Sequence, residues 1–393
     1  MIYLRGAMTH PFRNVAIVGV HNTLQARQLP GHTSLSISTE AAHGALADAG
    51  LAMSDVDGVV GEFAGEMILG SAGGPRSRRI SRFGIPMLLD AAALITSGEC
   101  AVVLVAAGGA GLYTDRSATA PWTRPGNEFV APYGMFTAAE FALMARRHMI
   151  RFGTTHAQMA GAAAAIRNHG AANPQAVFFG KGPVTAADVV ASRPIAEPFH
   201  LLDCSMTSEG GCAVVMVAAD RLTDLDRMPV WIHGAAGDTF GPAYVVAPVF
   251  DGGGSGDDAA GWVGRRAARR SLAMAGLTTD DVDVAEFYDP FSFEIIRQLE
   301  AFGFCDEGEG GAFVEAGHTA IGGRLPVTTD GGTMSFSHPG INAQQVQRVV
   351  RGVQQLRGDC PSGQVPGAEV AMCTNGGSGA LFCDVMVLGS GRP

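Results

Sequence analysis

Short apolar runs alternate along the chain with longer segments whose apolar residues recur at helical spacing. The apolar runs predict strands, which lie at residues 15–20, 56–60, 101–106, 211–217, 230–235, 282–287, 369–372 and 380–387. The helical spacing predicts helices at residues 41–49, 84–95, 262–275 and 340–356. Strands that alternate with helices build sheets covered by helices, so the pattern predicts an α/β fold.

One segment of this pattern occurs twice. Residues 45–57 recur at 271–283 with eight identical positions, at a separation far beyond a solenoid period of roughly 20–50 residues. The flanking strands and helices also correspond, so we expect two copies of one module, each with its own sheet. The first copy covers residues 1–107 and 203–228, the second covers 229–393, and the active site is expected between them.

An insert at residues 108–202 has no counterpart in the second copy. Its apolar spacing predicts helices at 138–152 and 157–168, joined by loops rich in proline, glycine and polar residues. Insertions of this length usually form a lid or a binding subdomain. We therefore expect an inserted loop subdomain here.

Composition and charge narrow the class of protein. Hydrophobic residues make up 47% of the 393 residues and charged residues 16%, which predicts a large buried core. The formal net charge of −10 argues against nonspecific nucleic-acid binding, although Arg76, Arg78, Arg79 and Arg82 form a basic cluster. No apolar run reaches the roughly 18 residues of a membrane helix, and residues 1–12 lack a signal-peptide core. The expectation is a cytoplasmic enzyme.

The cysteines give no sign of a disulfide framework or a metal site, whereas two predicted helix starts suit an anionic ligand. The seven cysteines are scattered and include no Cys-x-x-Cys pair, which indicates neither a disulfide framework nor a metal site. Glycine-bounded turns precede the helices expected at 84–95 and 340–356. Helix N-termini carry partial positive charge and free N–H groups, so both starts suit an anion or an oxyanion.

Several motifs together resemble the thiolase superfamily, specifically its sterol-carrier-protein-type and lipid-transfer-protein-like members. They cover nearly the whole chain and include Ser337-His338-Pro339-Gly340 and the Cys-Thr-Asn-Gly-Gly-Ser-Gly run at 373–379. The others lie at residues 152–155, 173–174, 192–198, 201–205, 302–315, 322–332 and 354–358. The resemblance implies a duplicated, five-layered αβαβα fold, a dimer, and acyl-CoA thioester substrates with no further cofactor.

The first departure from the family is the missing nucleophile. A thiolase has a nucleophilic cysteine at the start of a first-half helix, where this chain has Ser81, three residues before Gly84. No cysteine precedes Cys100, which follows that helix and reads as a core residue. Ser81 would need an adjacent base to act as a nucleophile, and no motif marks one. The sequence therefore argues against an acyl-cysteine intermediate and against ordinary thiolysis.

The second departure is Tyr288, within Phe287-Tyr288-Asp289-Pro290-Phe291. It replaces the histidine or asparagine with which the family binds the thioester oxygen. A phenol can donate a hydrogen bond to an oxyanion or move a proton, although a buried tyrosine can also serve packing alone. Asp289 is a candidate that we expect to orient the loop.

The remaining candidates belong to the two C-terminal motifs. His338 keeps the family histidine and can take or give a proton near neutral pH, while Ser337 replaces the preceding glycine. Cys373 keeps the second cysteine and is either catalytic or a small buried residue. The backbone of Asn375, Gly376 and Gly377 can approach a ligand and form an oxyanion hole.

Acid–base groups without a nucleophile predict a retro-aldol reaction on a β-hydroxyacyl-CoA. Tyr288 and His338 are the candidates for base and enolate stabiliser. The pattern resembles the thiolase-like aldolases of bacterial steroid side-chain degradation, which implies a steroid acyl group and a small zinc-ribbon/OB-fold partner protein. The arginine cluster at 76–82 could contact CoA phosphates or that partner. Two alternatives are an acyltransferase or Claisen-type enzyme that uses Cys373 or Ser81, and a non-catalytic CoA-binding subunit.

Overall fold

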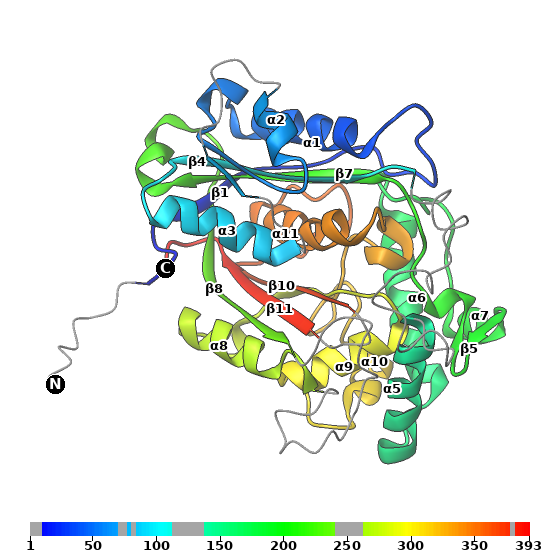
Figure 1. The fold of residues 1–393 in the computed structure, drawn as a ribbon. Helices are drawn as coiled ribbons and strands as arrows, with labels where there is room; N and C mark the ends of the chain where they lie inside the picture. Colours follow the sequence, from blue (N-terminus) through cyan, green and yellow to red (C-terminus); the bar gives the residue numbers. More distant parts are fainter. Residues whose placement is uncertain (1–9, 70–76, 80–83, 112–136, 240–261, 378–381) are drawn as a thin grey trace, which may run out of the picture.

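The computed structural model describes residues 10–69, 77–79, 84–111, 137–239, 262–377 and 382–393. Five layers of helices and sheet follow one another in Figure 1. Helices α1 (Ser34–Ala49) and α2 (Ala64–Leu69) cover one side of the first sheet layer. Helices α3 (Gly84–Thr96) and α11 (Ile341–Arg357) lie between the two sheet layers. Helix α8 (Arg265–Ala275) covers the far side, which completes the predicted αβαβα arrangement.

The strands of the two halves are hydrogen-bonded into one sheet of nine strands in the described chain, in the order β3-β2-β4-β7-β1-β8-β11-β10-β9. Their bounds are β1 Val15–Asn22, β2 Gly58–Val60, β3 Ser77–Arg79, β4 Val102–Gly109, β7 Gly210–Ala218, β8 Val230–Thr239, β9 Val284–Glu286, β10 Val370–Gly377 and β11 Phe382–Gly389. We expected two separate sheets. The halves instead meet through β1 and β8, which pair only at Ala16–Trp231 and Ile17–Val230.

The duplicated segment forms the same local structure twice. Gly50 and Gly276 end their helices in the left-handed region, with φ of 71° and 69°. The Asp57 carboxylate accepts hydrogen bonds from the backbone N–H groups of Ala101 and Val102, at the start of β4, at 2.8 and 3.1 Å. The Asp283 carboxylate accepts from the equivalent N–H groups at the start of β10, at 2.8 and 2.9 Å. The identical residues therefore hold the same turn in both copies.

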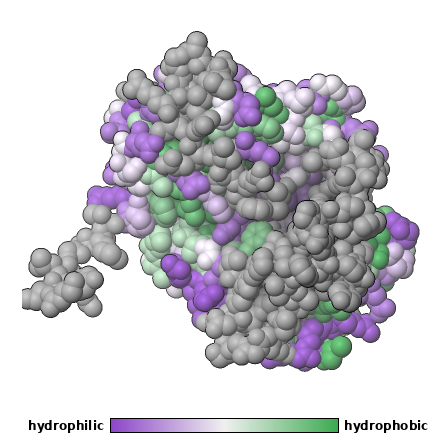
Figure 2. All heavy atoms as spheres, viewed as in Figure 1, coloured by the Kyte–Doolittle hydropathy of each residue, from purple (hydrophilic) through white to green (hydrophobic). Residues whose placement is uncertain are grey.

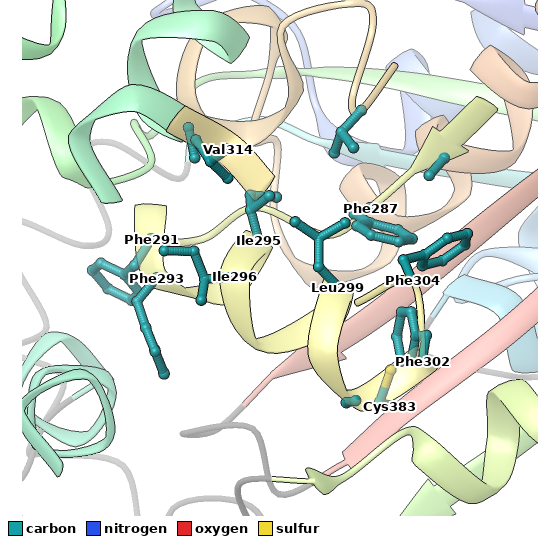
Figure 3. Packing of buried hydrophobic residues seen from close by; sticks show 14 of the residues in the cluster. Phe287, Phe291, Phe293, Ile295, Ile296, Leu299, Phe302, Phe304, Val314 and Cys383 are labelled. Atoms are coloured by element: carbon teal, nitrogen blue, oxygen red, sulfur yellow. The ribbon is translucent and has the colours of Figure 1, made fainter. Parts of the chain in front are cut away.

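The insert packs against the second half of the chain, on one side of the molecule (Figure 1). Its elements are α5 (Thr137–Phe152), α6 (His156–Ala172), α7 (Ala186–Ala191), β5 (Pro194–Ala196) and β6 (Phe199–His200). Both predicted helices are present, and α6 packs against α9 and α10. The core beside α9 is rich in phenylalanine, and Figure 3 shows Phe291 and Phe293 at one end and Phe302 at the other.

Three helical elements that position the site were not predicted from the sequence. They are α9 (Ser292–Phe302), α10 (Gly310–Glu315) and a π-helix, η10 (Gly332–Phe336). All residues of α9 are buried, including its charged and amide side chains. Its charged residues pair inside the core, with Arg297 Nε 2.8 Å from Glu294 Oε2.

The described surface mixes polar and apolar side chains. Figure 2 shows hydrophilic and hydrophobic residues interspersed over the described part of one face. Among the described residues, no helix has the length and apolar character needed to cross a membrane.

Candidate active site

Four segments converge at one end of the second half's sheet layer. The loop after β9 meets the 203–209 segment, since Ser205 N donates to Pro290 O at 2.9 Å. The same segment meets the π-helix and the residues after it, through Met206 N to Thr333 O at 3.1 Å and Ser208 N to His338 O at 3.3 Å. The end of β10 is the fourth segment. These contacts bring together motifs that are far apart in the chain.

Tyr288 lies against the end of β10. Its backbone N–H donates to Thr374 Oγ1 at 3.0 Å, and its carbonyl accepts from Gln298 Nε2 at 2.7 Å. The ring covers Gly376, because a Cβ at that glycine would lie 3.3 Å from Tyr288 Cδ1. The side chain is buried, with 6% of the residue exposed. The position of the phenol ring is therefore fixed by the backbone on one side and by a glycine on the other.

His338 is held by the 203–209 segment. Its backbone N–H donates to Ser208 Oγ at 2.7 Å, and its ring Nδ1 lies 2.7 Å from Met206 O. A carbonyl oxygen can only accept, so Nδ1 carries the hydrogen in this contact. In the neutral imidazole this places the lone pair on Nε2, the nitrogen that can take a proton.

The π-helix η10 links the two candidate residues. Asp289, next to Tyr288, accepts hydrogen bonds from Thr333 N at 2.8 Å and Met334 N at 3.1 Å. The same π-helix leads directly into Ser337 and His338. Asp289 is fully buried, and burial raises its pKa to about 7, against the opposing effect of Arg348. Asp289 thus lies in the position expected of a loop-orienting residue.

A buried ion cluster supports the π-helix from the side of α11. Arg348 forms two hydrogen bonds of 2.8 Å with the Asp330 carboxylate, which also accepts from the N–H of Gly332. Oε2 of Glu286 lies 3.7 Å from Nη1 of Arg348. Neighbouring carboxylates raise the pKa of Arg348 against its desolvation, so its charge is retained.

Ser337 lies in a buried polar network and not at a free surface. Its hydroxyl donates to Gln25 Oε1 at 2.5 Å and lies 3.1 Å from the hydroxyl of Ser208. Gln25 also accepts from Gln347 on α11 at 3.1 Å. The network links the first half of the chain to the backbone that carries His338. The network therefore holds the Ser337–His338 backbone of the second half against Gln25 of the first half.

Asn375 and Gly376 meet the start of α3. Gln345 Nε2 donates to Gly376 O at 2.8 Å, and its Oε1 lies 3.3 Å from Asn375 Nδ2. A Cβ at Gly84, the first residue of α3, would lie 2.3 Å from the Gln345 side chain and 3.3 Å from Asn375. Gly377 follows at the end of β10. The N-terminus of α3, where a thiolase carries its nucleophile, therefore lies at the glycine-rich end of β10.

Two predicted features fall partly or wholly outside the described residues. Ser81, with Arg76 and Arg82, lies outside them. The backbone of Arg78 and Arg79 belongs to β3, which pairs with β2 at one edge of the sheet. Within the described chain, no group of three or more histidine, cysteine, aspartate and glutamate residues could hold a metal ion.

The structure does not bring Cys373 to this group. The thiol faces Gly352 of α11, where a Cβ would lie 2.6 Å from Sγ, and the residue is fully buried in the core. Gln345, which contacts Gly376, is two helical turns nearer the start of α11. Burial, with a smaller effect of Glu286, holds the pKa of the Cys373 thiol well above its usual value, which disfavours a thiolate.

Replacing Cys373 with alanine is expected to leave kcat/KM unchanged and to lower the free energy of unfolding by about 1 kcal/mol, because only core packing is lost. Activity assays and urea unfolding of the same preparation check both values. A loss of activity without a loss of stability would contradict this assignment and favour a catalytic thiol.

The sequence reasoning missed the residues that position the motifs. Gln298 and Thr374 hold Tyr288, Met206 and Ser208 hold His338, and Gln345 holds the end of β10. For Gln298, Thr374 and Gln345, the signal in the sequence was polarity at otherwise apolar positions of α9, β10 and α11. Met206 acts through its backbone carbonyl, so its side chain gave no such signal.

Comparisons with known proteins agree with this architecture. A family model described as "Thiolase C-terminal domain-like" matches residues 257–390. The chain is 32% identical over 381 residues to 17-hydroxy-3-oxo-4-pregnene-20-carboxyl-CoA lyase of Mycobacterium tuberculosis (strain ATCC 25618 / H37Rv), covering 92% of this chain and 96% of that protein. It is 32% identical over 362 residues to the steroid side-chain-cleaving aldolase of Thermomonospora curvata, covering 86% and 90%.

Two further similarities bear on the chemistry. An acetyl-CoA acetyltransferase of Methanothermobacter thermautotrophicus is 33% identical over 394 residues, covering 93% of this chain and 97% of that protein. Among solved structures, the "Ltp2-ChsH2(DUF35) aldolase" superposes with a TM-score of 0.84 at 29% identity, covering 98% of this chain and all of that chain. Lyases and an acyltransferase are thus equally similar in overall sequence, so the site residues must distinguish the two reactions.

Proposed function

The chain belongs to the thiolase superfamily, and from that premise we propose that it cleaves a β-hydroxyacyl-CoA by a retro-aldol reaction. The observation that carries the proposal is the missing nucleophile. No cysteine precedes Cys100 in the sequence, and Cys100 lies in the core behind α3. Tyr288 and His338 remain at the site, whereas the cysteine nucleophile that thiolysis needs is missing.

The reaction requires one base and one enolate stabiliser. His338 Nε2 removes the proton from the β-hydroxyl group, since Nδ1 is engaged with Met206 O. The oxygen electrons form the new C=O bond, the Cα–Cβ bond breaks, and its electrons form the thioester enolate. The Tyr288 hydroxyl donates a hydrogen bond to the enolate oxygen. Protonation at Cα then gives a shorter acyl-CoA, released with a ketone or aldehyde.

The substrate and partner follow from the relatives. Names of two relatives specify steroid side chains or a pregnene carboxyl-CoA, so we infer a steroid acyl-CoA as substrate. The CoA thioester is part of the substrate, and the reaction uses no other cofactor. The aldolase structure pairs its thiolase-like chain with ChsH2(DUF35), which supports a small zinc-ribbon/OB-fold partner here. A homodimeric, cytoplasmic form of this complex is part of the proposal.

The second candidate is acyl transfer, which the similarity to an acetyltransferase favours. It requires a nucleophile from Ser81 or Cys373. A covalent acyl-enzyme, detected by mass spectrometry after incubation with an acyl-CoA, would support this reading. The third candidate, a non-catalytic CoA-binding subunit, requires that Tyr288→Phe and His338→Ala leave the activity of the complex unchanged.

The deciding experiment follows products by liquid chromatography with mass detection. The complex receives a 17-hydroxy-3-oxo-4-pregnene-20-carboxyl-CoA without added free CoA. A steroid ketone with a short acyl-CoA supports the proposal. No cleavage there, together with CoA-dependent cleavage of a β-ketoacyl-CoA, would overturn it and favour thiolysis.

Replacing Tyr288 with phenylalanine is expected to lower kcat by about 10²-fold, because the enolate loses one hydrogen-bond donor in a buried site. KM and the melting temperature are expected to change little, since the ring still packs on Gly376. Steady-state kinetics and thermal unfolding check these values. A Tyr288→Phe enzyme that keeps the wild-type kcat would contradict this role.

A further inference from the structure

One buried carboxyl group differs from the others in its surroundings. The buried carboxyl side chains of the described residues are Glu140, Asp203, Glu209, Asp238, Glu286, Asp289, Glu294, Glu300 and Asp330. All except Glu140 accept at least one hydrogen bond from a described group. Neither oxygen of Glu140 has a hydrogen-bond partner within the part of the chain that the structure describes, although the residue is 0% exposed.

An unpaired buried carboxyl is costly for the fold, because it loses its hydration and gains nothing in return. Desolvation raises the pKa of Glu140 to about 7. The same helix satisfies its other buried polar group completely. His148 on α5 contacts Glu300 through one ring nitrogen and Thr154 through the other, both at 2.9 Å. Glu140 is therefore an exception within α5, and such exceptions concentrate at functional sites.

Glu140 lies at the end of α5 that adjoins the catalytic loop. The next residue, Phe141, packs with its ring centroid 5.0 Å from that of Phe291. Phe291 ends the Tyr288 loop and is the N-cap residue of α9, and its ring also stacks on Phe199 with the centroids 5.1 Å apart. Figure 3 shows Phe291 and Phe293 together at the start of α9. The first turn of α5 thus borders an aromatic cluster that continues from the Tyr288 loop.

We propose that Glu140 contacts the substrate and binds an oxygen atom of the acyl group, at a position remote from the thioester. This inference rests on the proposed function. A polycyclic acyl group matches apolar surroundings and carries few polar atoms. A carboxyl group can accept a hydrogen bond from a hydroxyl, or donate one to a ketone when protonated. An oxygen on the distant ring would supply the partner that Glu140 lacks, and it would fix the position of the skeleton.

The test compares binding of two CoA thioesters that differ in one oxygen. These are 3-oxo-4-pregnene-20-carboxyl-CoA and its analogue with a methylene group at position 3. Calorimetric titration of the complete complex gives both dissociation constants. Wild type is expected to bind the oxo compound about 10- to 100-fold more tightly. Glu140→Leu is expected to abolish this preference, whereas Glu140→Gln, which still forms a hydrogen bond, is expected to keep most of it.

Controls separate a ligand contact from a structural role. Leu143→Gln, an exposed position on the next turn of α5, is expected to leave the preference unchanged. At pH 8, where the carboxyl is charged, Glu140→Leu is expected to raise the melting temperature. If the Glu140→Leu variant does not fold, Glu140→Met is used in its place. The inference is overturned if wild type binds both thioesters equally, or if the apolar variants keep the preference.

The result is independent of cleavage, because neither thioester carries the β-hydroxyl group that a retro-aldol reaction needs. An oxo preference without cleavage of the 17-hydroxy compound would reject the proposed function alone. Cleavage without an oxo preference would reject the role of Glu140 alone.

Discussion

Replacing His338 with glutamine is expected to lower kcat for retro-aldol cleavage by about 10²–10⁴-fold, the range usual for loss of a general base. The imidazole is held through Nδ1 by Met206 O, and Nε2 is the nitrogen proposed to take the proton. Glutamine is similar in size but cannot accept a proton at neutral pH. Its backbone N–H keeps the bond to Ser208 Oγ, so the fold is expected to persist.

Rapid-quench measurement of a single turnover checks this expectation, because it separates the chemical step from product release. His43→Gln is the matched control, since His43 is exposed on α1, in the outer layer of the first half. The control is expected to behave as wild type. A His338→Gln enzyme that retains full single-turnover rate would leave Tyr288 as the base.

Replacing Arg348 with methionine is expected to lower the free energy of unfolding by about 3–5 kcal/mol, because it leaves buried carboxylates without their counter-charge. Arg348 is fully buried and forms both hydrogen bonds of the Asp330 pair. Asp289 and Glu286 also depend on its charge, since Arg348 opposes the rise in the pKa of each. Methionine fills similar space but carries no charge.

Chemical unfolding of wild type and variant gives the difference in free energy. Arg324→Gln is the control, because its ion pair with Asp280 lies at the surface, with side-chain exposures of 56% and 81%. Surface pairs contribute about 0–1 kcal/mol, so this variant is expected to remain close to wild type. Equal losses in the two variants would show that burial of the Arg348 cluster adds nothing to its stabilising effect.

The layered fold was predictable because its signals are local. The helix ends at Gly50 and Gly276 and the repeated aspartates Asp57 and Asp283 mark the same turn twice. The pairing of β1 with β8 was not predictable, since only two residue pairs make it and no sequence pattern specifies them. Helix α9 was missed for a related reason: its charges are neutralised within the core, so its composition resembles that of an exposed segment.

The site was predictable only as far as its motifs reach. Tyr288 and His338 were found by their place in two motifs, and the structure connects them through the π-helix that Asp289 holds. The same kind of reasoning left Cys373 as either catalytic or a small buried residue, and the structure buries it fully in the core. The motif gives the order of residues along β10, but it does not show which of them are buried in the core and which reach the site. Gln345 and Gln298 act across elements, and a single sequence does not show which elements meet.

The internal duplication also offers a comparison within one molecule. Tyr288 stands five residues beyond Asp283, and the residue five beyond Asp57 is Glu62. Glu62 accepts a hydrogen bond from Asn342 on the first turn of α11, at 3.0 Å. Positions at which the two copies agree preserve the turn, whereas this pair has diverged into a carboxylate and a phenol. The first half thus serves as an internal comparison for the second, and exchanging residues between the copies would measure what each difference contributes to activity.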